Sequence, residues 1–299
     1  MRAISFYFLL FIVAISDCFG QYTETINSNR PGQSQGAFSV GRGVLQLESG
    51  LIYSDESHEI LATETSGWGA DFLLRYGLLF EQLEINVGGS YAYETITRTS
   101  GNAAELNQSG FPRLMVGLKF LIYDPYKNYE KKVNLYSYHA NNKPDWRALI
   151  PAVSVYSGTN FVYNENPFFS APGVPAGSQE GFTPQAALIT QHNYMSLVWV
   201  NNIIADYFTT DYPTYTWITT LTHSFDEKFA GFVEYQLINS DIYADDLVRF
   251  GGAFLASKNF QLDLSALMNF KETPRRLQIT LGLSFRLDGH KDPKPSLTN

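Results

Sequence analysis

The sequence predicts a single antiparallel transmembrane β-barrel of about twelve strands, an all-β fold. Residues 276–287 carry apolar side chains at every odd position and polar or small ones between them. Successive side chains of a β-strand point to opposite faces, and a strand tilted across a bilayer needs about 9–11 residues. The N-terminus predicts export, and no later apolar run is long enough for a spanning helix. A closed barrel is the other fold that satisfies every backbone polar group within lipid.

The first twenty residues have the layout of a secretory signal peptide. Arg2 gives a positive start, residues 5–16 are apolar, and the small Gly20 precedes Gln21. We expect cleavage after Gly20. A buried N-terminal strand or helix is the alternative, and a lipoprotein would use Cys18, although Asp17 before it suits lipoprotein processing poorly. Cleavage after Gly20 removes the only cysteine, so the mature chain would hold no disulfide.

Composition fits one exported barrel. Aromatic residues make up 15% of the chain, while the mean hydropathy is only -0.15, as expected when half of each strand is polar. The net charge of -8 argues against a general nucleic-acid binder. We divide the chain into a signal peptide (1–20), a polar periplasmic or luminal lead segment (21–42), the barrel (43–287) and a polar C-terminal tail (288–299).

Twelve segments have strand character. They are 43–53, 70–79, 83–94, 114–123, 148–157, 183–191, 195–205, 214–223, 229–239, 247–257, 260–270 and 276–287. An even count returns both ends of the barrel to the same side, with longer loops outside and short turns in the periplasm. Connections 54–69, 95–113 and 158–182 are external by this count, whereas the long connection 124–147 is periplasmic and breaks the pattern. Alternation is weak in 148–157, which contains Pro151, and in 183–191.

No catalytic or metal site emerges from the sequence. The five histidines show no metal-ligand spacing, and no G-x-S-x-G motif occurs. His192 is expected in a tight turn. Ser224 follows His223, but neighbours on a strand point to opposite faces and cannot form a nucleophile–base pair. We therefore expect no enzyme activity, no metal and no cofactor.

Charged residues lie on the faces predicted to point inward. Because Arg or Lys at the lipid midplane costs about 2–4 kcal/mol, these side chains should point into the lumen and pair there. They could form a structural salt-bridge lattice, or they could line a selective path for a small solute. With Arg30 of the lead segment, the lumen-lining candidates are Glu48, Asp71, Arg75, Glu84, Lys119, Glu234, Arg249, Asp263 and Arg286.

Two short motifs resemble a known family. The segment 29–32 (NRPG), followed by Gln46, Glu48 and Gly50 in the first strand, is similar to the start of the outer-membrane family of MetA-pathway phenol-degradation transporters. Residues 112–119 resemble the fourth strand of that family. The resemblance implies a barrel that moves small aromatic or hydrophobic compounds.

We therefore expect a passive channel or transporter in the cell outer membrane. Its partners would be outer-membrane lipids, the barrel-insertion machinery during biogenesis and a small solute that the sequence does not name; nucleic acid is not expected. The alternative is a structural or adhesive barrel without conduction. Arg30 lies next to a Pro–Gly turn, so we hypothesise that the lead segment folds back over the periplasmic mouth and that Arg30 pairs with Glu48.

Overall fold

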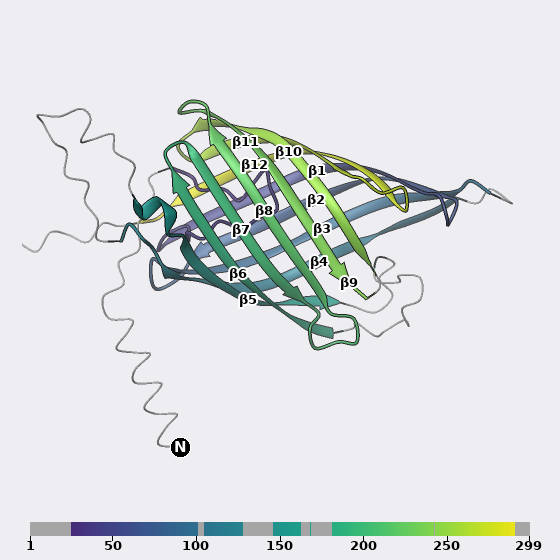
Figure 1. Cartoon of the computed structure of the whole chain (residues 1–299), viewed down its shortest axis with the longest axis horizontal. Helices are drawn as coiled ribbons and strands as arrows, with labels where there is room; N and C mark the ends of the chain where they lie inside the picture. The colour runs from purple at the N-terminus through teal and green to yellow at the C-terminus, as the bar shows by residue number, and fades with distance from the viewer. Residues whose placement is uncertain are drawn as a thin grey trace, which may run out of the picture.

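The computed structural model is a closed barrel of twelve antiparallel strands, which confirms the predicted fold (Figure 1). It describes residues 25–100, 105–127, 146–162, 168, 181–241 and 243–290. Each strand pairs with its sequence neighbours, and β12 closes the barrel against β1. The strands are β1 (Val44–His58), β2 (Thr63–Gly77), β3 (Leu83–Arg98), β4 (Glu105–Tyr123), β5 (Ala152–Val162), β6 (Gly181–Tyr194), β7 (Leu197–Asp206), β8 (Thr214–Ser224), β9 (Phe229–Ser240), β10 (Ala244–Ser257), β11 (Phe260–Asn269) and β12 (Arg275–Asp288).

The alternation in the sequence becomes an apolar outside and a polar inside. On β12, Leu281 is 59% exposed on the outer face, whereas Ser284 is fully buried inside. The same division holds on β1, where Leu51 pairs with Leu281 and Gly50 pairs with Gly282. A two-faced strand of this kind suits a barrel with lipid outside and a filled lumen inside. Among the described residues, no helix is long and apolar enough to cross a membrane.

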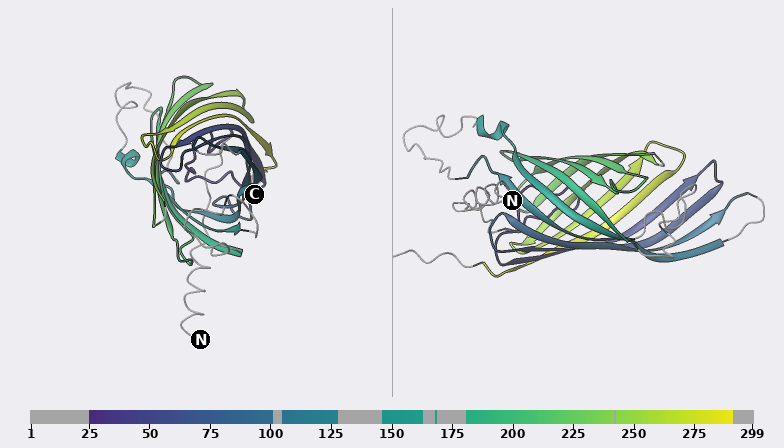
Figure 2. Two further views of the ribbon diagram at one scale, coloured as in Figure 1. Left: turned by 90° about the vertical axis from the view of Figure 1, so that its right-hand side faces the viewer. Right: turned by 90° about the horizontal axis from the view of Figure 1, so that it is seen from below.

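The first four strands are all longer than predicted. Residues 54–58 extend β1, residues 63–69 begin β2, and β3 and β4 occupy most of 95–113, so the first two predicted external loops are wrong. Figure 2 (right) shows β1 to β4, in purple to blue, projecting beyond the green strands. These extensions are polar and lack a membrane pattern, but cross-strand hydrogen bonding needs no apolar face.

Two further expectations need correction. The fifth strand begins at Ala152 rather than at residue 148, because Pro151 lacks an amide for the ladder and a short 3₁₀ helix, η1 (Trp146–Leu149), precedes it. His192 lies within β6, not in a turn, and its ring stacks on Trp199 with the centroids 5.2 Å apart. The predicted signal peptide (1–20), residues 128–145 of the long connection, and the tail beyond residue 290 lie outside the described residues.

The first residue of β1 and the last residue of β12 lie at the same end of the barrel. We call the end where β1 begins and β12 finishes the proximal end, and the opposite end the distal end. The proximal turns 195–196, 225–228 and 258–259 are short, whereas the proximal connection 124–151 is long and the distal connections 59–62 and 241–243 are short. By the rule for bacterial barrels, short turns mark the periplasmic side, so the proximal end is the one expected to face the periplasm.

Candidate functional site

The polar lead segment lies inside the barrel. Residues 25–42, which we call the plug, form no helix or strand, and Figure 2 (left) shows them in purple within the ring of strands. The Ile26 amide donates to the carbonyl oxygen of Lys258 in the proximal β10–β11 turn at 2.8 Å. At the other end of the plug, Gly41 accepts a hydrogen bond from the first residue of β1. The plug therefore enters the lumen from the proximal end, turns inside it and returns.

Arg30 is the most strongly bound residue of the plug. Its Nη1 donates to both carboxylate oxygens of Asp71 at 2.8 and 3.0 Å. Its Nε and Nη2 donate to the two oxygens of Asp263, each at 3.2 Å. Arg30 thus joins β2 to β11 over the two strands that lie between them in the barrel wall, β1 and β12. Both contacts are charge-assisted, and the one with Asp263 is bidentate.

The hypothesis that Arg30 pairs with Glu48 is wrong. The carboxylate of Glu48 instead accepts the backbone amide of Asn29 at 3.2 and 3.3 Å, and it forms an ion pair with Arg75 at 2.9 Å. The long Arg30 side chain reaches past Glu48 to carboxylates on other strands.

The environment keeps Arg30 charged. Burial alone would lower the pKa of its guanidinium. Asp71 and Asp263 outweigh burial, so the pKa lies above its ordinary value. The attachment of Arg30 is therefore an ion-pair contact at any physiological pH.

Carboxylates on the barrel wall bind the backbone of the plug. Glu234 accepts the amides of Gln33 and Ser34 at 2.9 and 3.2 Å. Glu84 accepts the amide of Val40 at 2.9 Å. A chain without secondary structure must find partners for its buried amides elsewhere, and here the wall provides them.

Uncharged wall residues complete this binding, and sequence reasoning missed them. The Asn202 carboxamide exchanges two hydrogen bonds with the backbone of Gln35, at 2.6 and 2.9 Å. Gln191 accepts the amide of Ala37 at 2.9 Å, and the Ser154 hydroxyl donates to the carbonyl oxygen of Ala37. Charge was the signal used to choose candidates. The remaining clue in the sequence would have been an uncharged polar side chain on an inward face, such as Asn202 on β7.

A small apolar contact supports the same part of the plug. Ala37 is completely buried and packs against Leu121, Tyr156 and Ile189 on β4, β5 and β6. The plug is therefore held by packing on one side of the lumen and by ion pairs on the other.

A second charge network lies toward the proximal end. Glu84 binds both Arg75, at 2.8 Å, and Lys119, at 3.3 Å. These two cations also donate to plug carbonyl oxygens: Arg75 to Asn27 at 2.8 Å, and Lys119 to Gly36 at 3.0 Å. With Glu48, the network has two cations and two carboxylates and is neutral overall.

The structure sorts the ten candidate residues into groups. Arg30, Asp71 and Asp263 form one cluster, and Glu48, Arg75, Glu84 and Lys119 form a second. Glu234 pairs with Arg249. Arg286 lies apart, near the proximal end, where it binds Asp288 at 3.2 Å. A role for these residues in solute selection stays a prediction.

Three cavities follow one another along the lumen. A distal vestibule of about 680 Å³ shares Ile52, Ser90 and Gln236 with a middle cavity of about 320 Å³. A proximal cavity of about 270 Å³ lies beyond the plug. Arg30 and Gly32 border both the middle and the proximal cavity, so the turn of the plug separates them.

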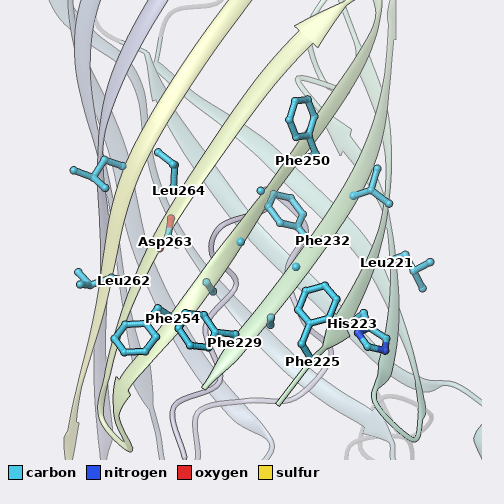
Figure 3. Close-up of a pocket in the computed structure, with 17 residues that line it drawn as sticks. Leu221, His223, Phe225, Phe229, Phe232, Phe250, Phe254, Leu262, Asp263 and Leu264 are labelled. Carbon is cyan, nitrogen blue, oxygen red and sulfur yellow. The ribbon is translucent and has the colours of Figure 1, made fainter. Parts of the chain in front are cut away.

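An apolar hollow of about 780 Å³ lies on the outer face of the barrel (Figure 3). Phe225, Phe229, Phe250 and Phe254 surround it. Its floor forms where glycines pair across β9 and β10, at positions 231 and 252. Because its lining is almost wholly apolar, it belongs to the face expected to contact lipid and not to the polar lumen.

One histidine has a hydroxyl within hydrogen-bonding distance. The Ser196 Oγ lies 3.2 Å from Nε2 of His223. Among the described residues, Nδ1 of His223 has no partner, so no carboxylate orients the ring as a catalytic triad requires. The described residues also contain no group of three or more His, Cys, Asp or Glu side chains that could hold a metal ion.

The match to a family model covers nearly the whole barrel. Residues 28–287 match the model of the family described as "Putative MetA-pathway of phenol degradation". The chain belongs to this family. The match begins within the plug and ends in β12, so plug and barrel together form the family's unit. No curated protein matches the chain.

Solved structures share the architecture at low sequence identity. The chain is similar to an outer-membrane channel from Pseudomonas putida F1, with a TM-score of 0.50, 10% identity, and coverage of 87% of this chain and 100% of that one. The translocator domain of the autotransporter NalP from Neisseria meningitidis gives a TM-score of 0.48 at 8% identity, covering 87% and 90% of the two chains. The first similarity shows a shared outer-membrane barrel fold.

Proposed function

We propose that the protein is a passive channel for small solutes across the outer membrane, and that the plug restricts passage through it. One observation carries this proposal: a row of lumen cavities is interrupted at the turn of the plug. Wall residues hold the plug by side-chain contacts, which can break without unfolding the barrel. The family description mentions phenol degradation, so small aromatic compounds are the first solutes to test.

A scaffold without conduction is the alternative, and the extensive binding of the plug favours it. Glu48, Glu84 and Glu234 each hold backbone amides of the plug, so a plug that never moves would close the lumen. A channel and a scaffold differ in whether weakening the plug opens a path.

Liposome swelling can decide between the two. Purified protein would be reconstituted with neutral solutes of graded size, from glycerol to disaccharides and benzyl alcohol. We expect slow swelling for the unaltered chain and faster swelling for Arg30→Ala. Absence of swelling for both proteins, and for a chain lacking residues 25–40, would show that the barrel is a scaffold.

Export and surroundings belong to the same proposal. The signal peptide would direct the chain to the barrel-insertion machinery, and outer-membrane lipids would cover the outward apolar belt that includes Leu51 and Leu281. N-terminal sequencing of membrane-extracted protein should begin at Gln21, or be blocked by pyroglutamate. A chain that starts at a lipid-modified Cys18 would contradict this.

A further inference from the structure

We propose that the middle cavity binds a small zwitterion, with Arg113 holding its carboxylate and Asp206 holding its ammonium group. The inference rests on the proposed channel function and names a class of solute for it. The cavity lies on the distal side of the plug and shares lining residues with the vestibule, so we expect a solute to enter it from the distal end without moving the plug.

Arg113 is a cation without an ion pair in a lumen where other cations are paired. It lies on β4, on the inward face shared by Met115 and Lys119, and it lines the middle cavity. Arg30, Arg75 and Lys119 each have a carboxylate within 3.3 Å. Among the described residues, none forms a salt bridge with Arg113. A planar guanidinium that faces a cavity in this state is suited to bind a carboxylate in two parallel hydrogen bonds.

Asp206 is the matching carboxylate without a cation. At the end of β7 it accepts the amide group of Asn160 at 2.9 Å, and the described residues offer it no salt bridge. The other carboxylates that line the cavity are engaged, Asp71 by Arg30 and Glu48 by Arg75. Arg113 and Asp206 line this one cavity, and within the described part of the chain they form no salt bridge with each other.

Unsatisfied acceptors surround Asp206. Gln185 is its cross-strand partner, only 3% exposed, and the Gln185 carboxamide oxygen has no hydrogen-bond partner among the described residues. The carboxamide oxygen of Asn160, which is 4% exposed, also lacks one. Buried polar atoms without partners are costly. The Gln185 oxygen and the Asp206 carboxylate belong to residues that line the same cavity, and both are acceptors that an ammonium group can donate to.

Apolar side chains also line the cavity. Met115, Tyr156 and Ile204 are among them. A ligand that satisfies the whole site therefore carries a carboxylate, an ammonium group and an apolar body. An amino acid with an apolar side chain has this chemistry.

Three probes on one carbon frame separate the two charge sites. L-Phenylalanine carries both charges, L-phenylalaninamide carries only the ammonium group, and 3-phenylpropanoate carries only the carboxylate. Their binding to the full mature chain in detergent would be measured by isothermal titration calorimetry. We expect phenylalanine to bind at least about tenfold more tightly than either analogue, because each lost contact is a charge-assisted hydrogen bond.

Removing one charge from the protein should have the same effect on affinity as removing the matching charge from the ligand. Arg113→Gln should weaken phenylalanine binding to the level of phenylalaninamide and leave phenylalaninamide unchanged. Asp206→Asn should weaken it to the level of 3-phenylpropanoate and leave that anion unchanged. Gln185→Met, which keeps the side-chain shape, should weaken phenylalanine several-fold and provides a second test if Asp206→Asn fails to fold.

Arg98→Gln and Asp211→Asn are matched controls. Arg98 is the last residue of β3, Asp211 lies in the distal connection between β7 and β8, and neither lines the cavity. Equal affinity for all three probes, anion binding as tight as that of phenylalanine, or equal losses in the controls would overturn the proposal. Swelling with neutral solutes is measured separately. A channel that passes neutral solutes but does not discriminate among the probes would leave the channel function standing and refute only the zwitterion site.

Discussion

Gly50 and Gly282 are cross-strand partners on β1 and β12, and the guanidinium of Arg30 occupies the space that their missing side chains leave. A Cβ atom on either glycine would overlap the guanidinium nitrogens. The two glycines therefore form a slot at the point where the barrel closes. Arg30 lies over this slot and reaches Asp71 on one side and Asp263 on the other.

Filling the slot should release Arg30. We expect Gly282→Ala to displace the guanidinium and to increase the swelling rate with small neutral solutes. In an Arg30→Ala background the same change should add little, as expected when two alterations remove one interaction. Additive effects in this double-mutant cycle would show that Gly282 acts independently of Arg30.

Removing the two carboxylates that bind Arg30 should affect the plug differently from removing Glu48, which does not bind Arg30. Removing the partners of a buried charge typically costs about 3–5 kcal/mol, so the combined Asp71→Asn and Asp263→Asn variant should loosen the plug strongly. Limited proteolysis from the proximal side, together with swelling rates, would measure this. Replacing Arg30 by Met in that variant should restore part of the protection, because no buried charge then remains unpaired.

The outward and inward faces of β12 predict opposite responses to a new charge. Leu281→Arg places a cation in the lipid-facing belt and should cost about 2–4 kcal/mol of folding free energy near the midplane. Gln278→Arg places the same side chain in the vestibule and should cost much less. Urea titrations of protein folded into lipid vesicles would compare them. Similar losses for both variants would contradict the register.

The proximal turn before β9 should weaken in acid. The amides of Lys228 and Phe229 donate to the Asp226 carboxylate and lower its pKa below the ordinary value. A carboxyl group with a lowered pKa stabilises the folded turn above its unfolded-state pKa and loses that effect as the pH falls through the folded-state pKa. We expect hydrogen exchange at the Phe229 amide, corrected for its intrinsic pH dependence, to show less protection at low pH. Asp226→Asn should show a flat response.

All twelve strands could be predicted from the sequence, but the bounds were accurate only where alternation is clean. Residues 276–287 matched β12 to within one residue at each end, whereas Pro151 marked a boundary that hydrophobicity alone placed too early. The polar extension of β4 has no apolar face. By its pattern Arg113 therefore falls in the predicted connection 95–113, although residues 112–119 resemble the fourth strand of the family. Asp206 lies one residue beyond its predicted strand.

The contacts of the plug were beyond sequence reasoning for a different reason. Arg30 and Asp263 are 233 residues apart, and no local pattern links them. The polar composition of residues 21–42 indicated a segment outside the membrane pattern. Which carboxylate Arg30 would reach depended on barrel closure and on two glycines that look ordinary in the sequence.

The bridge that Arg30 makes between β2 and β11 also sets an order of assembly. Asp71 belongs to the first hairpin of the barrel and Asp263 to the last, and the slot between Gly50 and Gly282 exists only once β12 has joined β1. Residues 25–42 precede every strand in the chain, yet they can take up their final positions only after the last strand has paired. A plug in its final position therefore indicates that the barrel has closed correctly.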